Sequence, residues 1–216
     1  MTKTRAVHIG VAACSLVMML WAPGLLAAGG QKVSCTTCPV TDVDPHASKA
    51  LGPVTASGSH ACKTQEKNGF PVPDPSCTPG AVNPTVTVVV LRNPKFRTGC
   101  VRDCETTLAM KATTYDNYGI PHPAQNSGAT QTCELDHLVS LELGGADTLD
   151  NLWPQCGPSN VSQAQRFFKQ KDRVENFLAA QVKSGAMDLE TAQRGIAEDW
   201  TQFLLEAKTF CASHGC

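Results

Sequence analysis

The residues best suited to chemistry are Asp136 and His137, which stand side by side in a segment bounded by Cys133 and Cys156. A histidine that is neutral near pH 7 can take a proton from water. A carboxylate is a hard oxygen ligand for Mg²⁺ or a similar ion, which can polarise a phosphate. The pair could therefore activate water beside a metal-bound phosphate. An Asp-His dipeptide is also common by chance, and then usually forms only a surface hydrogen bond.

The surrounding segment predicts a strand, a turn, a second strand and a helix. Apolar residues recur from 135 to 143, the pair Gly144-Gly145 can supply the positive φ of a turn, and a short strand fits residues 149–153. Neighbouring residues on a strand point to opposite faces of the sheet. Asp136 and His137 can therefore serve one site only if a bulge or bend distorts the end of the first strand.

Two helices are predicted after this hairpin. Asn160 or Ser162 can cap a helix that runs to about Ser184, where a glycine follows. Asp188 can cap a second helix that runs to about Lys208. Apolar residues recur at helical spacing in both helices, so we expect these stripes to form core rather than a ligand site.

The chain before the hairpin is less regular. Residues 29–75 are rich in Pro and Gly, which disfavours long helices and central strands, and Cys62 and Cys77 can hold the end of this region. The β-branched stretch 85–91 predicts a strand. Residues 105–118 have the spacing of a helix.

The string ELDHLVSLELGGADTLDNLWPQ, residues 134–155, resembles the exported HNH-type (ββα-metal) endonuclease family. That family shows an acidic-Asp-His start, a Leu-Gly-Gly turn and an Asn-Leu-Trp-Pro end. A Lys-Asp-x-x-Glu on a later helix is also typical, and here it is Lys171, Asp172 and Glu175. The stretch PDPSCTPGAVNP, residues 73–84, is similar to sequence that precedes such domains. The resemblance spans about residues 62–208. It implies an α+β fold with a ββα-metal (HNH-like) unit and C-terminal helices, stabilised by disulfides.

The resemblance also implies a role for each matching residue. His137 matches the general base, Asp136 matches the metal ligand before it, and Asn151 matches the residue that braces the loop and orients the base. The family's third position, a His or Asn metal ligand at the start of the helix, has no clear match, and Asn160 is the nearest candidate. The implied reaction is hydrolysis of nucleic-acid phosphodiesters with Mg²⁺ or Mn²⁺. The string does not distinguish DNA from RNA.

Basic residues provide candidate contacts for a nucleic-acid partner. Lys169, Lys171 and Arg173 follow the motif and are plausible phosphate contacts. A second basic cluster comprises Arg92, Lys95, Arg97 and Arg102. Taken alone, both clusters are typical of ordinary solvated surface. Removing the two leader residues from the 18 Lys and Arg leaves 16 basic against 19 acidic residues. This balance excludes a strongly basic nucleic-acid binder.

The N-terminus has the pattern of a secretory leader. Lys3 and Arg5 precede an apolar run over residues 9–26, and small residues then offer a cleavage site near Ala28. We therefore expect residues 1–28 to be a signal peptide and the mature protein to be periplasmic or secreted. A membrane anchor is the alternative for the run. No later segment is apolar enough to span a bilayer, so we expect no membrane contact after cleavage.

Cysteine usage points to the same oxidising compartment. Of the 11 cysteines, Cys14 falls in the leader, and the remaining even number can form disulfides. Cys35 and Cys38 also have zinc-ligand spacing, but no second such pair accompanies them. If the hairpin turns about Gly144-Gly145, Cys133 and Cys156 face each other across the two strands, so we predict that they form a disulfide.

These observations divide the chain into a leader, residues 29–75 as a Pro/Gly-rich disulfide-containing region, and residues 76–216 as an HNH-like nuclease domain with a C-terminal helical pair. The predicted function is an exported metal-dependent endonuclease. One alternative is a catalytically inactive HNH-fold protein that binds nucleic acid, motivated by the unmatched third ligand. The other is a disulfide-rich structural or interaction protein, in which Asp136 and His137 merely bond each other. The oligomeric state is not predicted.

Overall fold

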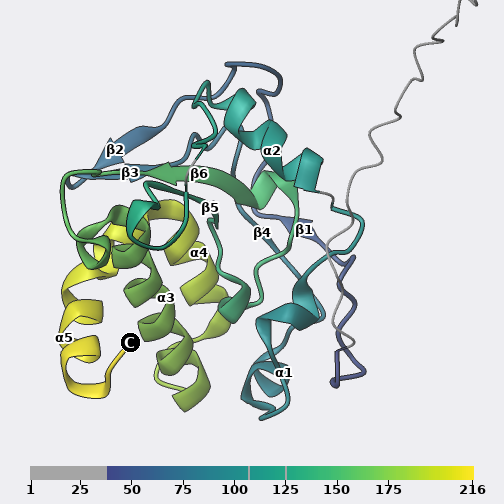
Figure 1. Cartoon of the computed structure of the whole chain (residues 1–216). Coiled ribbons are helices and arrows are strands. Elements are labelled where there is room, and N and C mark those ends of the chain that lie inside the picture. Colours follow the sequence, from purple (N-terminus) through teal and green to yellow (C-terminus); the bar gives the residue numbers. More distant parts are fainter. Residues whose placement is uncertain (1–37, 107, 125) are drawn as a thin grey trace, which may run out of the picture.

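The structure is a computed structural model that describes residues 38–106, 108–124 and 126–216. The predicted leader, its cleavage site and Cys35 lie outside these residues. The described chain combines helices with small antiparallel sheets, in agreement with a disulfide-stabilised α+β fold (Figure 1). None of the helices in these ranges is long and apolar enough to cross a bilayer.

The helices and strands follow one another with long irregular connections. The helices of the described ranges are α1 (Val88–Arg92), α2 (Leu108–Asn117), α3 (Phe167–Ser184), α4 (Leu189–Asp199) and α5 (Leu204–His214). The strands pair antiparallel as β1 (Lys49–Ala50) with β4 (Ala81–Val82), β2 (Gln65–Lys67) with β3 (Phe70–Val72), and β5 (Cys133–His137) with β6 (Leu152–Cys156). Helices α2 and α3 both contact the β5–β6 hairpin, which is the longest of these pairs.

The β5–β6 hairpin has the predicted register. Cys133 lies opposite Cys156, Asp136 opposite Trp153, and His137 opposite Leu152. The predicted Cys133–Cys156 disulfide is present, with its two Cα atoms 4.0 Å apart. In the chain-entropy model a bridge across this 23-residue separation contributes about 3 kcal/mol of stability.

The connection between β5 and β6 is wider than the predicted tight turn. It contains two short 3₁₀ turns, Leu141–Leu143 and Leu149–Asn151, and the second strand begins at Leu152 rather than at residue 149. Gly144 adopts the left-handed conformation at φ 71°, as predicted for the glycine pair. Gly145 is required for a different reason, because a Cβ there would lie 1.9 Å from the Val139 carbonyl oxygen.

Three further disulfides lie within the described residues, and one of them, Cys38–Cys100, ties the N-terminal part to the rest. Cys62 is bonded to Cys77 and Cys38 to Cys100, while Cys211 and Cys216 close a short ring at the C-terminus. Cys38 is therefore not a zinc ligand in this structure. In its described residues, 38–75, the Pro-rich region contains strands of two or three residues and no helix, as its composition predicts. These disulfides indicate an oxidising compartment.

Two further element predictions were wrong. The stretch 85–91 is not a strand: its last four residues belong to helix α1, and Thr87 caps this helix by accepting a hydrogen bond from Val90 N. Val90 and Leu91 then face the core while Val89 remains 79% exposed, so packing outweighs the β propensity of the run. The helix predicted to run from Asp188 to about Lys208 is instead interrupted after α4.

The interruption is a 3₁₀ turn, Trp200–Phe203, between α4 and α5. The Asp199 side chain accepts a hydrogen bond from Thr201 N, and the Trp200 indole donates to the Pro71 carbonyl oxygen at 3.1 Å. These two bonds stop one helix and begin the next. Helix α2 lies within the predicted range 105–118, and α3 ends at Ser184 as predicted, with Gly185 in the left-handed conformation. The predicted start of α3 was wrong: it begins at Phe167, and Ser162 caps the separate 3₁₀ turn Gln163–Gln165 instead.

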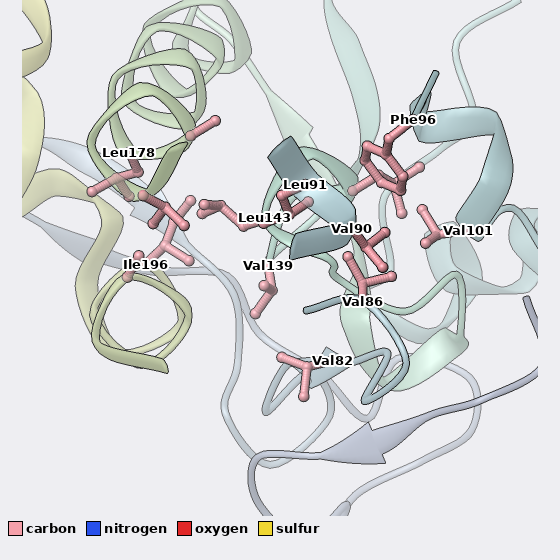
Figure 2. Close-up of a cluster of buried hydrophobic side chains, with 14 of the residues drawn as sticks. Val82, Val86, Val90, Leu91, Phe96, Val101, Val139, Leu143, Leu178 and Ile196 are labelled. Carbon is pink, nitrogen blue, oxygen red and sulfur yellow. The ribbon is translucent and has the colours of Figure 1, made fainter. Parts of the chain in front are cut away.

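The core holds the connection that follows His137. Val139 and Leu143, both in this connection, are fully buried between α1 and the helices α3 and α4 (Figure 2). Leu178 of α3 and Ile196 of α4 pack in the same cluster. Because the core fixes the backbone on the C-terminal side of His137, the end of β5 is held rigidly.

Candidate functional site

Asp136 and His137 point away from each other. Strand β5 remains regularly paired with β6 through His137, so its side chains alternate between the two faces. Asp136 faces α3, where the Lys171 ammonium lies 3.0 Å from its Oδ2. His137 instead approaches Asp147, on the β5–β6 connection. The strand distortion that a common site requires is absent from β5, and the two residues have different partners.

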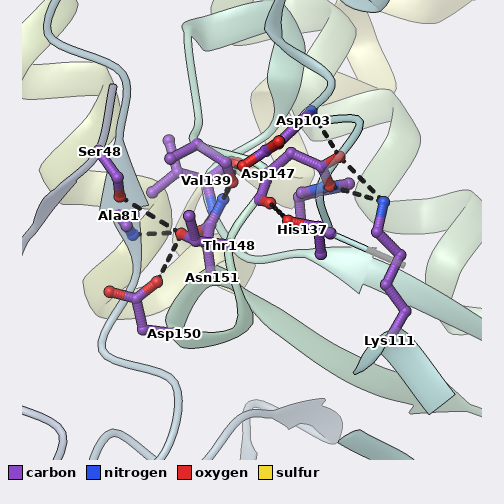
Figure 3. A network of polar contacts seen from close by, with 12 residues as sticks. Ser48, Ala81, Asp103, Lys111, His137, Val139, Asp147, Thr148, Asp150 and Asn151 are labelled. Atoms are coloured by element: carbon purple, nitrogen blue, oxygen red, sulfur yellow. Dashed lines mark hydrogen bonds and ion pairs between the residues drawn. The ribbon is translucent and has the colours of Figure 1, made fainter. Parts of the chain in front are cut away.

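A buried carboxylate holds the His137 ring. His137 Nε2 lies 2.8 Å from Asp147 Oδ1 (Figure 3). The Lys111 ammonium of α2 donates to both oxygens of Asp147 at 2.9 Å, and the Asp103 amide donates to Oδ2 at 3.1 Å. The Asp147 side chain is fully buried, while that of His137 remains 11% exposed. Asp147 thus fixes the Nε2 side of the ring, while a small part of the His137 side chain reaches the surface.

Burial favours the neutral form of the His137 imidazole. Burial lowers the pKa of His137 below its usual value of 6.5, although Asp147 acts in the opposite direction. Burial alone would raise the pKa of Asp147, but hydrogen bonds and charges from His137 and Lys111 outweigh it and hold that pKa at about 2. A carboxylate next to a neutral imidazole requires the proton on Nε2. His137 Nδ1 has no hydrogen-bond partner among the described residues, so it is free to accept a proton.

Asn151 braces the connection between β5 and β6 through four hydrogen bonds. Its side chain is fully buried, with Nδ2 donating to the carbonyl oxygens of Val139 at 3.0 Å and Ala146 at 2.8 Å. Its Oδ1 accepts from the amides of Val139 at 2.9 Å and Ala81 at 3.3 Å. Asn151 therefore ties Val139 to Ala146, the residue before Asp147, without contacting the His137 ring (Figure 3).

Lys171 is buried rather than available to a phosphate. Its side chain has no exposed surface, and its ammonium donates to Glu175 Oε1 and to the His137 carbonyl oxygen. A fully enclosed ammonium cannot contact the backbone of a nucleic acid, which corrects the predicted role of this residue. Lys169 pairs with Asp172 at 2.6 Å and Arg173 bonds Gln170, and both cations remain partly exposed.

The two predicted metal ligands, Asp136 and Asn160, lie in different surroundings. Asn160 is exposed, and no hydrogen bond or ion pair of the described ranges joins it to Asp136. The Asp136 carboxylate already faces the Lys171 ammonium, which compensates its charge. Nor do the described residues include a group of three or more His, Cys, Asp or Glu side chains arranged to hold a metal. The donors around Asp136 therefore do not fit the expected ion while Lys171 is in place.

Sequence reasoning missed Asp147 and Lys111. Asp147 lies ten residues beyond His137, and only the folding of the β5–β6 connection brings the two together. Its position just after Gly144-Gly145 was the available signal, since a polar residue beside a turn can fold back onto the preceding strand. Arg102 is a further addition: it is exposed, and it lies close enough for its charge to lower the pKa of His137.

A cavity of about 520 Å³ lies elsewhere in the described part of the chain, and its walls include Pro53, Pro73, Leu138 and Trp200. None of the residues that bond His137 lines it, so we place the candidate site by its polar geometry rather than by cavity size. No protein-family model, no curated protein and no solved structure matches the chain.

Proposed function

We propose that the protein is an exported hydrolase of nucleic-acid phosphodiesters in which His137 is the general base. The observation that carries the proposal is the 2.8 Å contact between His137 Nε2 and the buried Asp147 carboxylate. This contact fixes the tautomer and leaves Nδ1 as the acceptor, as carboxylates do for catalytic histidines elsewhere. The ordered string from Glu134 to Gln155 supports the choice of phosphodiester substrate, and the disulfides support export.

The reaction needs a water molecule at His137 Nδ1. As the water oxygen bonds to phosphorus, its proton moves to Nδ1, and the ester P–O bond breaks with the leaving oxygen taking a proton from solvent. A positioned base contributes about 10²–10⁴ in rate. Arg102 is exposed near the ring and can offset the charge on the phosphate. Asp147 stays ionised and stabilises the imidazolium that forms. No step is assigned to a metal ion.

A digestion assay tests the proposal directly. The purified protein, with its disulfides intact, is incubated with supercoiled plasmid, single-stranded DNA and RNA, and products are resolved on gels. We expect cleavage of at least one substrate. Binding without cleavage would instead support the inactive nucleic-acid-binding alternative, which the Lys171 ammonium beside Asp136 favours. If the protein neither binds nor cleaves nucleic acid, the structural or interaction role remains.

The pH dependence of cleavage follows from the environment of His137. Because burial lowers its pKa below 6.5, the ring stays unprotonated and active as the pH falls below that value. The acid limb of kcat/KM is therefore expected to have its midpoint below pH 6.5. Initial rates measured from about pH 4 to pH 8 give this midpoint. A midpoint near or above pH 7 would mean that His137 is not the titrating base.

A further inference from the structure

The Lys171 ammonium is surrounded by oxygens of the kind that bind metal ions. Its Nζ lies 3.0 Å from Asp136 Oδ2, 2.7 Å from the His137 carbonyl oxygen and 2.5 Å from Glu175 Oε1. Two carboxylates and a main-chain carbonyl form a hard donor set, which Mg²⁺ and Mn²⁺ prefer. The ammonium thus stands where a cation bound by Asp136 would stand.

The Asp136 carboxylate supports this interpretation. Asp136 is 9% exposed, and its Oδ2 atom is buried without a well-aligned hydrogen bond. The Lys171 ammonium lies 3.0 Å from this oxygen as an ion-pair partner. A buried carboxylate oxygen without such a bond needs a cation to compensate it. The Asp136 and Glu175 side chains remain 11% and 16% exposed, so a small ion could reach them from solvent if the ammonium were absent.

We propose that the Lys171 ammonium is the resident cation of the Asp136 site, so that wild-type protein binds no divalent ion there, and that a shorter side chain at position 171 opens the site to Mn²⁺. The same ammonium is a positioning group, because its bond to the His137 carbonyl oxygen ties the end of β5 to α3. The positioning role rests on the proposed function; the occupancy of the site by the ammonium does not.

Mn²⁺ binding, measured by electron paramagnetic resonance, tests the proposal independently of nuclease activity. Wild-type protein should show no tight Mn²⁺ site. Lys171→Ala should bind one Mn²⁺ per chain at least about tenfold more tightly than wild type, because three oxygens and the vacated volume become available. Adding Mn²⁺ should also raise the melting temperature of Lys171→Ala and leave that of wild type unchanged.

Two control variants identify the ligands. Lys171→Met removes the charge but keeps the volume filled, so it should bind no Mn²⁺. The double variant Lys171→Ala, Asp136→Asn should lose the site gained by Lys171→Ala. If Lys171→Ala binds no Mn²⁺, or binds it equally well without the Asp136 carboxylate, the proposal is wrong.

The wild-type protein gives a further comparison that does not depend on how the Lys171 variants fold. A Mn²⁺ ion bound to wild type and lost in Asp136→Asn would overturn the proposal, because it would show that the ammonium does not exclude the metal. These results are distinct from a failure of the proposed function. A wild-type protein that cleaves no nucleic acid would refute the nuclease assignment and leave the Mn²⁺ comparison intact.

Discussion

Asn151→Ala is expected to lower the free energy of unfolding by about 3–5 kcal/mol, because it leaves several buried main-chain groups without partners. The Asn151 amide satisfies the N–H and carbonyl of Val139, the carbonyl of Ala146 and the N–H of Ala81. All of these bonds lie in the buried interior, where an unpaired group costs about 1–3 kcal/mol. Urea denaturation with the disulfides intact measures the change.

A matched control separates this effect from the loss of any asparagine. Asn176 is half-buried on α3. Among the described residues its side chain makes one hydrogen bond, from Nδ2 to the Asp172 carbonyl oxygen at 2.9 Å. Asn176→Ala should therefore cost less than about 1 kcal/mol. If Asn151→Ala is no more destabilising than Asn176→Ala, the bracing role of Asn151 is wrong.

Asp147→Asn is expected to reduce kcat/KM on nucleic acid by roughly 10²–10⁴. An asparagine has the same shape, but its NH₂ group can donate to His137 Nε2, which would move the ring proton to Nδ1 and block the base. Lys111 would also lose its buried partner. The variant Asp147→Asn, Lys111→Met removes that unpaired charge, so it should recover stability without recovering activity.

Asp172→Asn is the control for Asp147→Asn. Asp172 pairs with Lys169 on the exposed side of α3, where both side chains are 35% exposed. Its substitution should change kcat/KM by less than about twofold, since exposed ion pairs contribute little. Steady-state rates of all these variants are measured on one substrate at one ionic strength, because salt weakens contacts with phosphate. Equal rates for Asp147→Asn and wild type would refute the role of Asp147.

The register of the hairpin was predictable because local rules agree there. Glycines at 144 and 145 set the place of reversal, and Cys133 and Cys156 are equidistant from it. The 3₁₀ turns of the connection change its path without changing its length, so the symmetric pairing survives the wider loop. Helix α3 was predictable for a similar reason, since Gly185 ends it where the apolar stripe ends.

The burial of Lys171 follows from its position on α3, and the spacing of apolar residues in the sequence predicts this position. Phe168, Lys171, Val174 and Leu178 recur at intervals of three and four residues, so all four lie on the buried face. Reading Lys171 by its charge rather than its position placed it on the surface with Lys169. Its partners could not be predicted, because Asp136 and Glu175 meet it only after α3 packs on β5.

The contact between His137 and Asp147 was beyond sequence reasoning for a different physical reason. It depends on the exact path of the β5–β6 connection, which is set by the Asn151 bonds and by Val139 and Leu143 in the core. Helix α1 shows the same limit, since its β-branched residues favour a strand until a Thr87 cap and tertiary packing decide otherwise. Non-local contacts thus determine both the surroundings of His137 and the path of α1.

Nuclease activity of wild type and His137→Ala, measured in parallel on the same DNA and RNA substrates, tests the central claim most directly. Circular dichroism and melting temperature first establish that both proteins are folded. Wild type is predicted to cleave at least one substrate, and His137→Ala to cleave it about 10²–10⁴ times more slowly, because water loses its proton acceptor. Equal cleavage by the two proteins, or none by wild type, would contradict the assignment of His137 as the base of a phosphodiester hydrolase.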